Sequence, residues 1–168
     1  CANLLGTGGT AVRFGWPSEH GRPQEFPLAI EWLAEKIGLE VGHGYRPPTR
    51  KDGGVDVVAW RGFPDRKPGI PVVLTQCTLQ EDIVAKARDI ETRVWASWLR
   101  MDVDPMTALA VPGTISRPLD WDLISVRTLL LERLRLAELS ATGRSSVLME
   151  WTTEVTRILS SDLDTYWV

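Results

Sequence analysis

The chain has 168 residues, of which 43% are hydrophobic and 24% are charged, and its formal net charge is −3. This composition excludes a disordered chain and indicates one globular domain with an apolar core. No apolar run approaches the roughly 18 residues that a membrane-spanning helix needs, and the acidic balance gives no basic nucleic-acid footprint.

The first segment, residues 1–24, is rich in glycine, proline and polar residues, and we expect it to form an irregular arm. Because the chain begins with Cys1 and not with methionine, we interpret this arm as a linker from an upstream domain. Cys1 and Cys77 do not make a disulfide framework, which favours a reducing, cytoplasmic environment.

Helical periodicity starts after this arm. Apolar residues recur at spacings of four, three and four from Phe26 to Ile37, which predicts a helix that stops at Gly38. Pro27 suits the first turn of this helix. Residues 39–45 are expected to form a short strand.

The rest of the chain alternates between strands and helices. Two apolar strands are predicted over residues 55–60 and 70–77. The second is apolar nearly throughout, which is typical of a central strand covered on both faces. The further elements expected are a long helix over 80–100, a strand over 107–111, an irregular connection over 114–126 anchored by Trp121, a strand over 128–131, and helices over 132–139 and 147–163.

This order of elements predicts an α/β domain with a mixed central β-sheet flanked by helices. We place the core at residues 25–142 and a C-terminal helical extension at residues 143–168. The apolar helix of this extension is a candidate surface for homodimer formation.

Two polar residues interrupt the apolar strands. Asp56 and Gln76 stand where a core strand should carry no polar side chain, and a buried carboxylate is costly unless it is paired or binds a cation. If the two strands are neighbours, both side chains converge at one edge of the sheet. A structural alternative is that Asp56 bonds backbone amides or pairs with Arg50 or Arg61.

The oxygen atoms available here suit a small, hard cation. The Asp56 carboxylate, the Gln76 amide oxygen and the backbone carbonyl of Cys77 form a ligand set for Mg²⁺, which keeps several waters and takes few protein ligands. Mn²⁺ is the alternative cation. Such an ion activates water and stabilises charge on a phosphodiester.

At these residues the chain resembles the PD-(D/E)XK phosphodiesterases, the restriction-endonuclease-like superfamily, and within it the Mrr-like branch. Gly54-Val55-Asp56 is similar to the first element of the family pattern, and Gln76-Cys77 is similar to the start of the second. Residues 129–136 are similar to that branch's closing strand and helix. The resemblance covers about residues 25 to 140 and implies a restriction-endonuclease-like fold.

The family pattern places a lysine where this chain has Thr78, which carries no charge. The resemblance implies that a lysine from another part of the chain takes this place beside the attacking water. Lys86 on the following helix is the first candidate, and Lys51 is the second. An acidic residue on the first helix is also part of the pattern, and Glu31 and Glu25 are the choices.

The resemblance therefore implies a metal-dependent nuclease that hydrolyses nucleic-acid phosphodiester bonds, with DNA as the first candidate substrate, in bacterial defence or DNA processing. Asp56, Gln76, Lys86 and Glu31 are its expected catalytic residues, and Asp56, Gln76 and Cys77 its expected metal ligands. The alternative is a catalytically inactive, nuclease-like module that binds nucleic acid or a protein partner.

Overall fold

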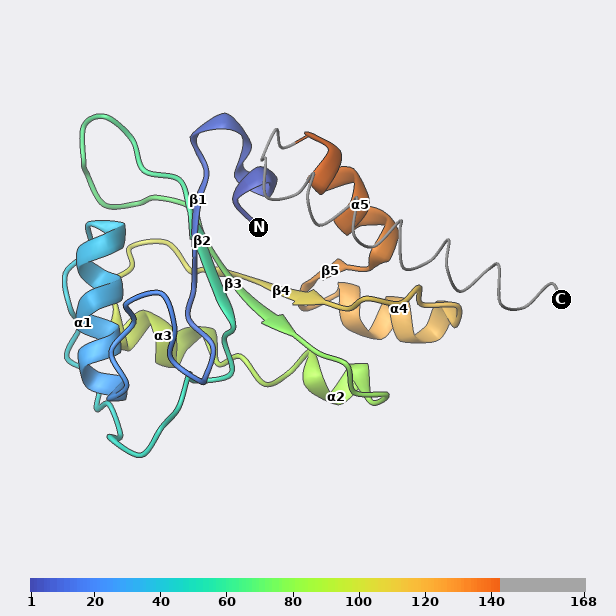
Figure 1. Ribbon diagram of the computed structural model, residues 1–168, viewed down its shortest axis with the longest axis horizontal. Coiled ribbons are helices and arrows are strands. Elements are labelled where there is room, and N and C mark those ends of the chain that lie inside the picture. The colour runs from blue at the N-terminus through green and yellow to red at the C-terminus, as the bar shows by residue number, and fades with distance from the viewer. Residues whose placement is uncertain (143–168) are drawn as a thin grey trace, which may run out of the picture.

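The computed structural model describes residues 1–142, in which five strands form one β-sheet with helices against both faces (Figure 1). In their order across the sheet, the strands are β1 (Thr10–Arg13), β2 (Val57–Trp60), β3 (Val72–Cys77), β4 (Met106–Ala110) and β5 (Leu129–Leu131). Neighbours among β1, β2 and β3 run antiparallel, whereas neighbours among β3, β4 and β5 run parallel. The predicted α/β domain with a mixed central sheet and flanking helices is confirmed.

Helix α1 (Phe26–Ile37) and helix α3 (Thr92–Trp98) cover one face of the sheet over β1, β2 and β3 (Figure 1). Helix α1 has a proline in its first turn and buries its apolar stripe in the core. It ends at Gly38, whose φ of 82° is a left-handed conformation that glycine adopts without steric cost. The helix predicted between Phe26 and Ile37 is thus confirmed.

Four aromatic rings form the centre of this core. Phe14, Phe26, Trp95 and Trp98 meet in edge-to-face pairs with centroid distances between 4.9 and 6.3 Å, the geometry that aromatic quadrupoles favour. The indole Nε1 of Trp95 donates a hydrogen bond of 3.2 Å to the Gly53 carbonyl. The core is therefore tied directly to the loop that precedes β2.

The opposite face is covered by the 3₁₀ helix η1 (Ala2–Gly8) and by helix α5 (Arg133–Thr142) (Figure 1). Because side chains alternate across a strand, β3 buries Val72 and Leu74 on the first face and Val73 on this one. Its burial on both sides explains its nearly continuous apolar sequence.

The N-terminal segment differs from the prediction. Residues 1–24 were expected to be an irregular arm, but η1 packs on the sheet and β1 pairs with β2 as an edge strand. Val12 of β1 packs on the first core and Ala11 on the opposite face. A strand of four residues between glycines gives little periodic signal, which is why the sequence did not indicate it.

The helix predicted over residues 80–100 is wrong as a single element. It is divided into α2 (Ile83–Lys86) and α3, with a connector at residues 87–91. The apolar stripe serves two separate clusters, because Ile83 packs near β4 and β5, whereas Ile90 packs on the aromatic core. Ile83 of α2 stays partly buried on its cluster, whereas Trp95 and Trp98 of α3 are buried in the aromatic core.

The connection predicted over residues 114–126 contains a helix, α4 (Pro118–Ser125). Its Ile124 is completely buried beneath β4 and β5, and Trp121 packs against the same cluster, as its predicted anchoring role requires. The helix was missed because only one of its eight residues is buried and its apolar periodicity is correspondingly weak.

The strand predicted over residues 39–45 is also wrong, because this segment contributes only an isolated bridge between Val41 and Leu99. The predicted extension over residues 143–168, including its helix, lies outside the described residues. Within residues 1–142, no helix combines the length and the apolar character needed to cross a bilayer.

Strands β2 and β3 are joined by a long hairpin loop. Residues 61–69 of this loop are all exposed. Because β2 and β3 are antiparallel, the loop lies at one end of the pair, and Asp56 and Gln76 lie at the other.

Candidate functional site

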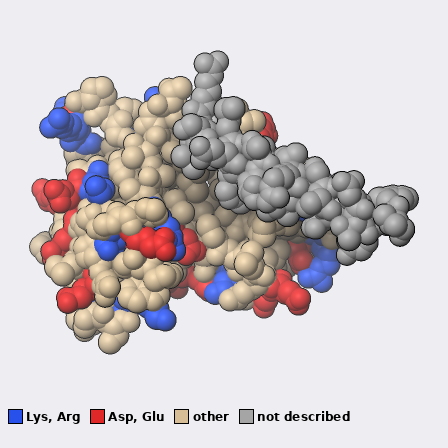
Figure 2. Space-filling view, viewed as in Figure 1, with Lys and Arg blue, Asp and Glu red and all other residues tan. Residues whose placement is uncertain are grey.

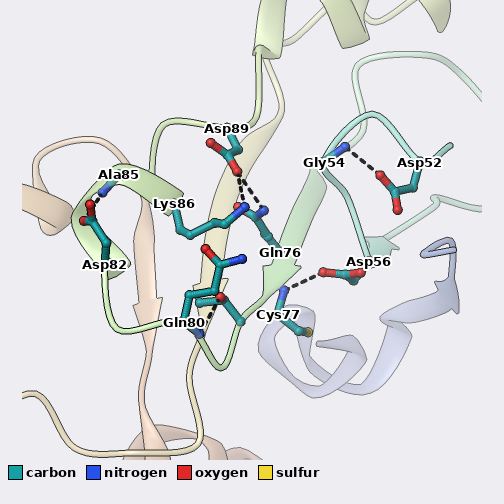
Figure 3. Close-up of polar contacts among 11 residues, drawn as sticks. Asp52, Gly54, Asp56, Gln76, Cys77, Gln80, Asp82, Ala85, Lys86 and Asp89 are labelled. Carbon is teal, nitrogen blue, oxygen red and sulfur yellow. Dashed lines mark hydrogen bonds and ion pairs between the residues drawn. The ribbon is translucent and has the colours of Figure 1, made fainter. Parts of the chain in front are cut away.

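A cavity of about 300 Å³ lies where β2 begins and β3 ends (Figure 3). Its lining consists of Asp52, Gly54, Asp56, Gln76, Cys77, Thr78, Gln80, Lys86 and Asp89. Four of the predicted site residues thus meet at one place, although Asp56 precedes β2, Gln76 and Cys77 belong to β3, and Lys86 belongs to α2.

Asp56 is held rigidly at the entrance to β2. Its backbone N–H donates to the Thr75 carbonyl at 2.8 Å, and its own carbonyl accepts the N–H groups of Phe14 and Gly15. The Oδ2 atom of its carboxylate accepts the Cys77 N–H at 2.7 Å. Of the two structural alternatives for Asp56, the bond to a backbone amide is confirmed by the Cys77 N–H. The arginine partner is wrong, because the carboxylate makes no ion pair with any residue that the structure describes.

Gln76 is the most unusual residue of the cavity. It is 8% exposed, and its Nε2 donates a hydrogen bond of 3.2 Å to Asp89 Oδ2. Its Oε1 is buried and has no hydrogen-bond partner in the part of the chain that the structure describes. An unsatisfied buried acceptor costs about 1–3 kcal/mol, so this oxygen calls for a ligand.

Lys86 is fixed by an ion pair with Asp89, with 2.8 Å between its Nζ and Asp89 Oδ2. The hydrogen bond from Lys86 lowers the pKa of Asp89, partly against the effect of burial, and the bond from Gln76 acts in the same direction. Figure 3 shows the Lys86 and Gln76 side chains converging on this one carboxylate. Asp89 lines the cavity but was not among the residues predicted for the site.

A tight loop brings a second carboxylate to the cavity. Asp52 Oδ1 accepts the Gly54 N–H at 3.0 Å, and its Oδ2 accepts the Trp16 N–H at 3.2 Å. Gly53 and Gly54 have φ values of 66° and 79°, which residues with a side chain rarely adopt. The two adjacent glycines therefore allow the chain to turn from Asp52 into β2.

The structure does not bring every predicted residue to the cavity. Glu31 on α1 and Glu25 before it are both exposed, and neither lines the cavity. Lys51 is also exposed and absent from the lining, which leaves Lys86 as the lysine at the site. Thr78 lines the cavity, and its hydroxyl accepts the Gln80 N–H at 3.1 Å.

Cys77 contributes its backbone rather than its side chain. Its N–H binds Asp56, and strand alternation directs its side chain to the face opposite Gln76. The residue is exposed and not buried within the sheet as free cysteines commonly are. Its carbonyl oxygen remains the atom proposed as a metal ligand.

The donor set fits a cation that needs few protein ligands. Among the residues that the structure describes, no group of three His, Cys, Asp or Glu side chains is placed to hold a metal. Three carboxylates line the cavity: Asp52 accepts two backbone N–H groups and Asp89 is paired with Lys86, whereas Asp56 accepts one N–H and shares the lining with Gln76, whose Oε1 has no partner among the described residues. Hard oxygen donors in this number suit Mg²⁺ or Mn²⁺ that retains several waters.

The Asp56 carboxylate also depends on a close approach of backbone. A Cβ atom at Gly15 would lie 2.6 Å from Asp56 Oδ1 and 3.2 Å from its Cα. We expect Gly15→Ala to displace Asp56 and to lower the free energy of unfolding by about 1–3 kcal/mol, measured by urea denaturation. Gly62→Ala is the matched control, because nothing lies within 4 Å of its added Cβ; equal effects of the two changes would contradict the expected crowding.

Comparison with known proteins gives a weak structural likeness. No protein-family model and no curated protein matches the sequence. A solved structure of MspJI restriction endonuclease in complex with a 27-mer oligonucleotide is similar at 21% sequence identity and a TM-score of 0.37. The match covers 86% of this chain and 32% of that chain, so the present chain spans about a third of the endonuclease's length.

Proposed function

We propose that the chain is a metal-dependent phosphodiesterase domain that hydrolyses nucleic acid, with DNA as the first candidate substrate. The resemblance of the segments around Asp56 and Gln76 to the PD-(D/E)XK pattern supports this proposal. Their convergence on one cavity supports it independently of the resemblance. The family's context of bacterial defence or DNA processing, and its Mrr-like branch, belong to the same proposal.

The observation that carries the proposal is the unpartnered Oε1 of Gln76. A protein interior normally satisfies buried acceptors, and an exception calls for an explanation. A divalent cation would explain it, because Gln76 lines the same cavity as the Asp56 carboxylate.

Each residue then has a defined task. Asp56 and Gln76 hold the cation, with the Cys77 carbonyl as a further ligand. When bound, the cation supplies Lewis-acid stabilisation of the charge that develops on the phosphodiester. The Lys86 ammonium lies at the same cavity, where its charge offsets that of the phosphate. Glu31 has no task in this scheme.

Plasmid DNA incubated with the purified chain tests the proposal. We expect cleavage in the presence of Mg²⁺ or Mn²⁺ and none after the cation is removed with EDTA. An intact plasmid under all cation conditions, with a folded protein, would reject the hydrolase function.

Two lysines allow a matched comparison within this assay. We expect Lys86→Ala to reduce the cleavage rate about 100-fold, since it removes a positioned charge from the reacting centre. Lys51→Ala removes the same charge from outside the cavity and is expected to leave the rate within about twofold, by the usual weakness of exposed, screened charges. Equal losses in the two variants would show that only overall charge matters.

The competing function is a nuclease-like module that binds without cutting. Thr78 occupies the position of the pattern's lysine, and Lys86 is already engaged by Asp89. Figure 2 shows basic and acidic side chains interspersed over the described part of one face. Slower migration of DNA in a mobility-shift assay, together with no cleavage, would favour the function of a binding module.

A further inference from the structure

We infer that Asp89 is a positioning residue that holds the Nε2 end of the Gln76 amide and so leaves its Oε1 as the unpartnered acceptor. The inference rests on the proposed function, because the oriented oxygen is the proposed cation ligand. Asp89 itself is not proposed to bind the cation or the substrate.

The two ends of a glutamine amide differ in their hydrogen bonding. One end donates and the other accepts, and rotation about the last side-chain bond exchanges them. Asp89 Oδ2 lies 3.2 Å from one end, and an ionised carboxylate only accepts hydrogen bonds. The Nε2 group must therefore face Asp89, because the reverse orientation would place an oxygen against a carboxylate.

The ionisation of Asp89 is itself supported by Lys86. The Lys86 ammonium lies 2.8 Å from the same Oδ2 atom that accepts from Gln76. Asp89 Oδ2 therefore accepts from two donors, and the Gln76 bond does not depend on the Lys86 side chain for its direction. Lys86, Asp89 and Gln76 thus form one connected unit on the wall of the cavity (Figure 3).

The break between α2 and α3 brings Asp89 to this wall. Asp89 lies in the connector at residues 87–91, and its carbonyl oxygen would be 3.3 Å from a Cβ atom placed on Gly54. The connector is therefore seated against the loop that leads into Asp56. Asp89 therefore reaches the cavity from a non-helical connector.

The first measurement concerns the amide itself and needs no cation. The side-chain NH₂ resonances of Gln76 are identified by their loss in Gln76→Ala. In the wild type and in Lys86→Ala, we expect them to show the slow exchange of a hydrogen-bonded amide. In Asp89→Ala they are expected to move to the position of a free glutamine. Unchanged resonances in folded Asp89→Ala would overturn the inference.

The second measurement is Mn²⁺ affinity by calorimetry. We expect Asp89→Ala to weaken binding about tenfold, a typical loss when a residue that orients a ligand is removed. Since this change also removes a negative charge, the double variant Asp89→Ala/Lys86→Ala restores the original net charge. Persistent weak binding in the double variant supports positioning, whereas recovery of wild-type affinity means that only charge was lost.

A control separates this effect from damage to α2. Asp82 caps α2 by accepting the Ala85 N–H at 3.0 Å, and it does not line the cavity. Asp82→Ala is expected to leave Mn²⁺ affinity unchanged; an equal loss would assign the effect to the helix and overturn the inference. A wild type that binds no Mn²⁺ would reject the proposed function, while the amide resonances would still decide whether Asp89 orients Gln76.

Discussion

Asp56→Asn is expected to reduce cation-dependent cleavage of DNA by at least about 100-fold while leaving the protein folded. The change removes the charge that would hold the cation. It retains an oxygen that can accept the Cys77 N–H, which Asp56 Oδ2 accepts at 2.7 Å. Asparagine therefore separates the loss of charge from the loss of the hydrogen bond, which alanine would combine.

Two measurements accompany this variant. The rate is taken from the disappearance of supercoiled plasmid over a range of Mn²⁺ concentrations, and the thermal midpoint reports folding. Asp65→Asn is the matched control, since Asp65 is an exposed residue of the loop at the other end of β2 and β3. Cleavage by Asp56→Asn at the wild-type rate would mean that the cavity is not the active site.

The largest effect on stability is expected for Trp95→Ala, which should lower the free energy of unfolding by about 3–5 kcal/mol. Trp95 is completely buried and contacts Phe14 and Trp98 edge to face. Its Nε1 also donates to the Gly53 carbonyl. Alanine would leave a large cavity in the core and release the loop before β2.

Phenylalanine at the same position divides this effect into its parts. Trp95→Phe retains an aromatic ring but loses the bond to Gly53, and we expect a smaller loss of about 1–2 kcal/mol. Urea denaturation measures both variants, with Leu119→Ala on α4 as a control at a side chain that is 67% exposed. If Trp95→Ala lowered the free energy of unfolding no more than Leu119→Ala, the expected contribution of the Trp95 indole to the core would be contradicted.

The sheet was predictable because its inner strands carry strong, simple patterns. Both apolar runs, around Val58 and Leu74, are buried as expected, and their antiparallel pairing brings Asp56 and Gln76 to the same end of the sheet. A polar side chain in a buried strand is informative because burial without a partner is expensive. That reasoning holds for Gln76, which is buried within β3, whereas Asp56 lies one residue before β2 and is half-buried, so its expected place inside a core strand is corrected.

The parts that escaped prediction depend on tertiary contacts. The division of the helix over residues 80–100 follows from two core clusters that only the folded sheet separates. Asp89 lies in the connector that this division creates, so its contact with Gln76 had no signal along the chain, whereas its spacing of three residues from Lys86 was visible there. Glu31 had the residue type expected of the pattern, but its side of α1 is exposed.

The hairpin loop at residues 61–69 has a practical consequence for the experiments above. All of these residues are exposed, and the antiparallel pairing places them at the far end of β2 and β3 from Asp56. A short affinity tag inserted after Gly62 would anchor the protein to a sensor chip with its cavity turned outward. Surface-bound protein could then be exposed in succession to oligonucleotides and cations, with every molecule attached through the same point.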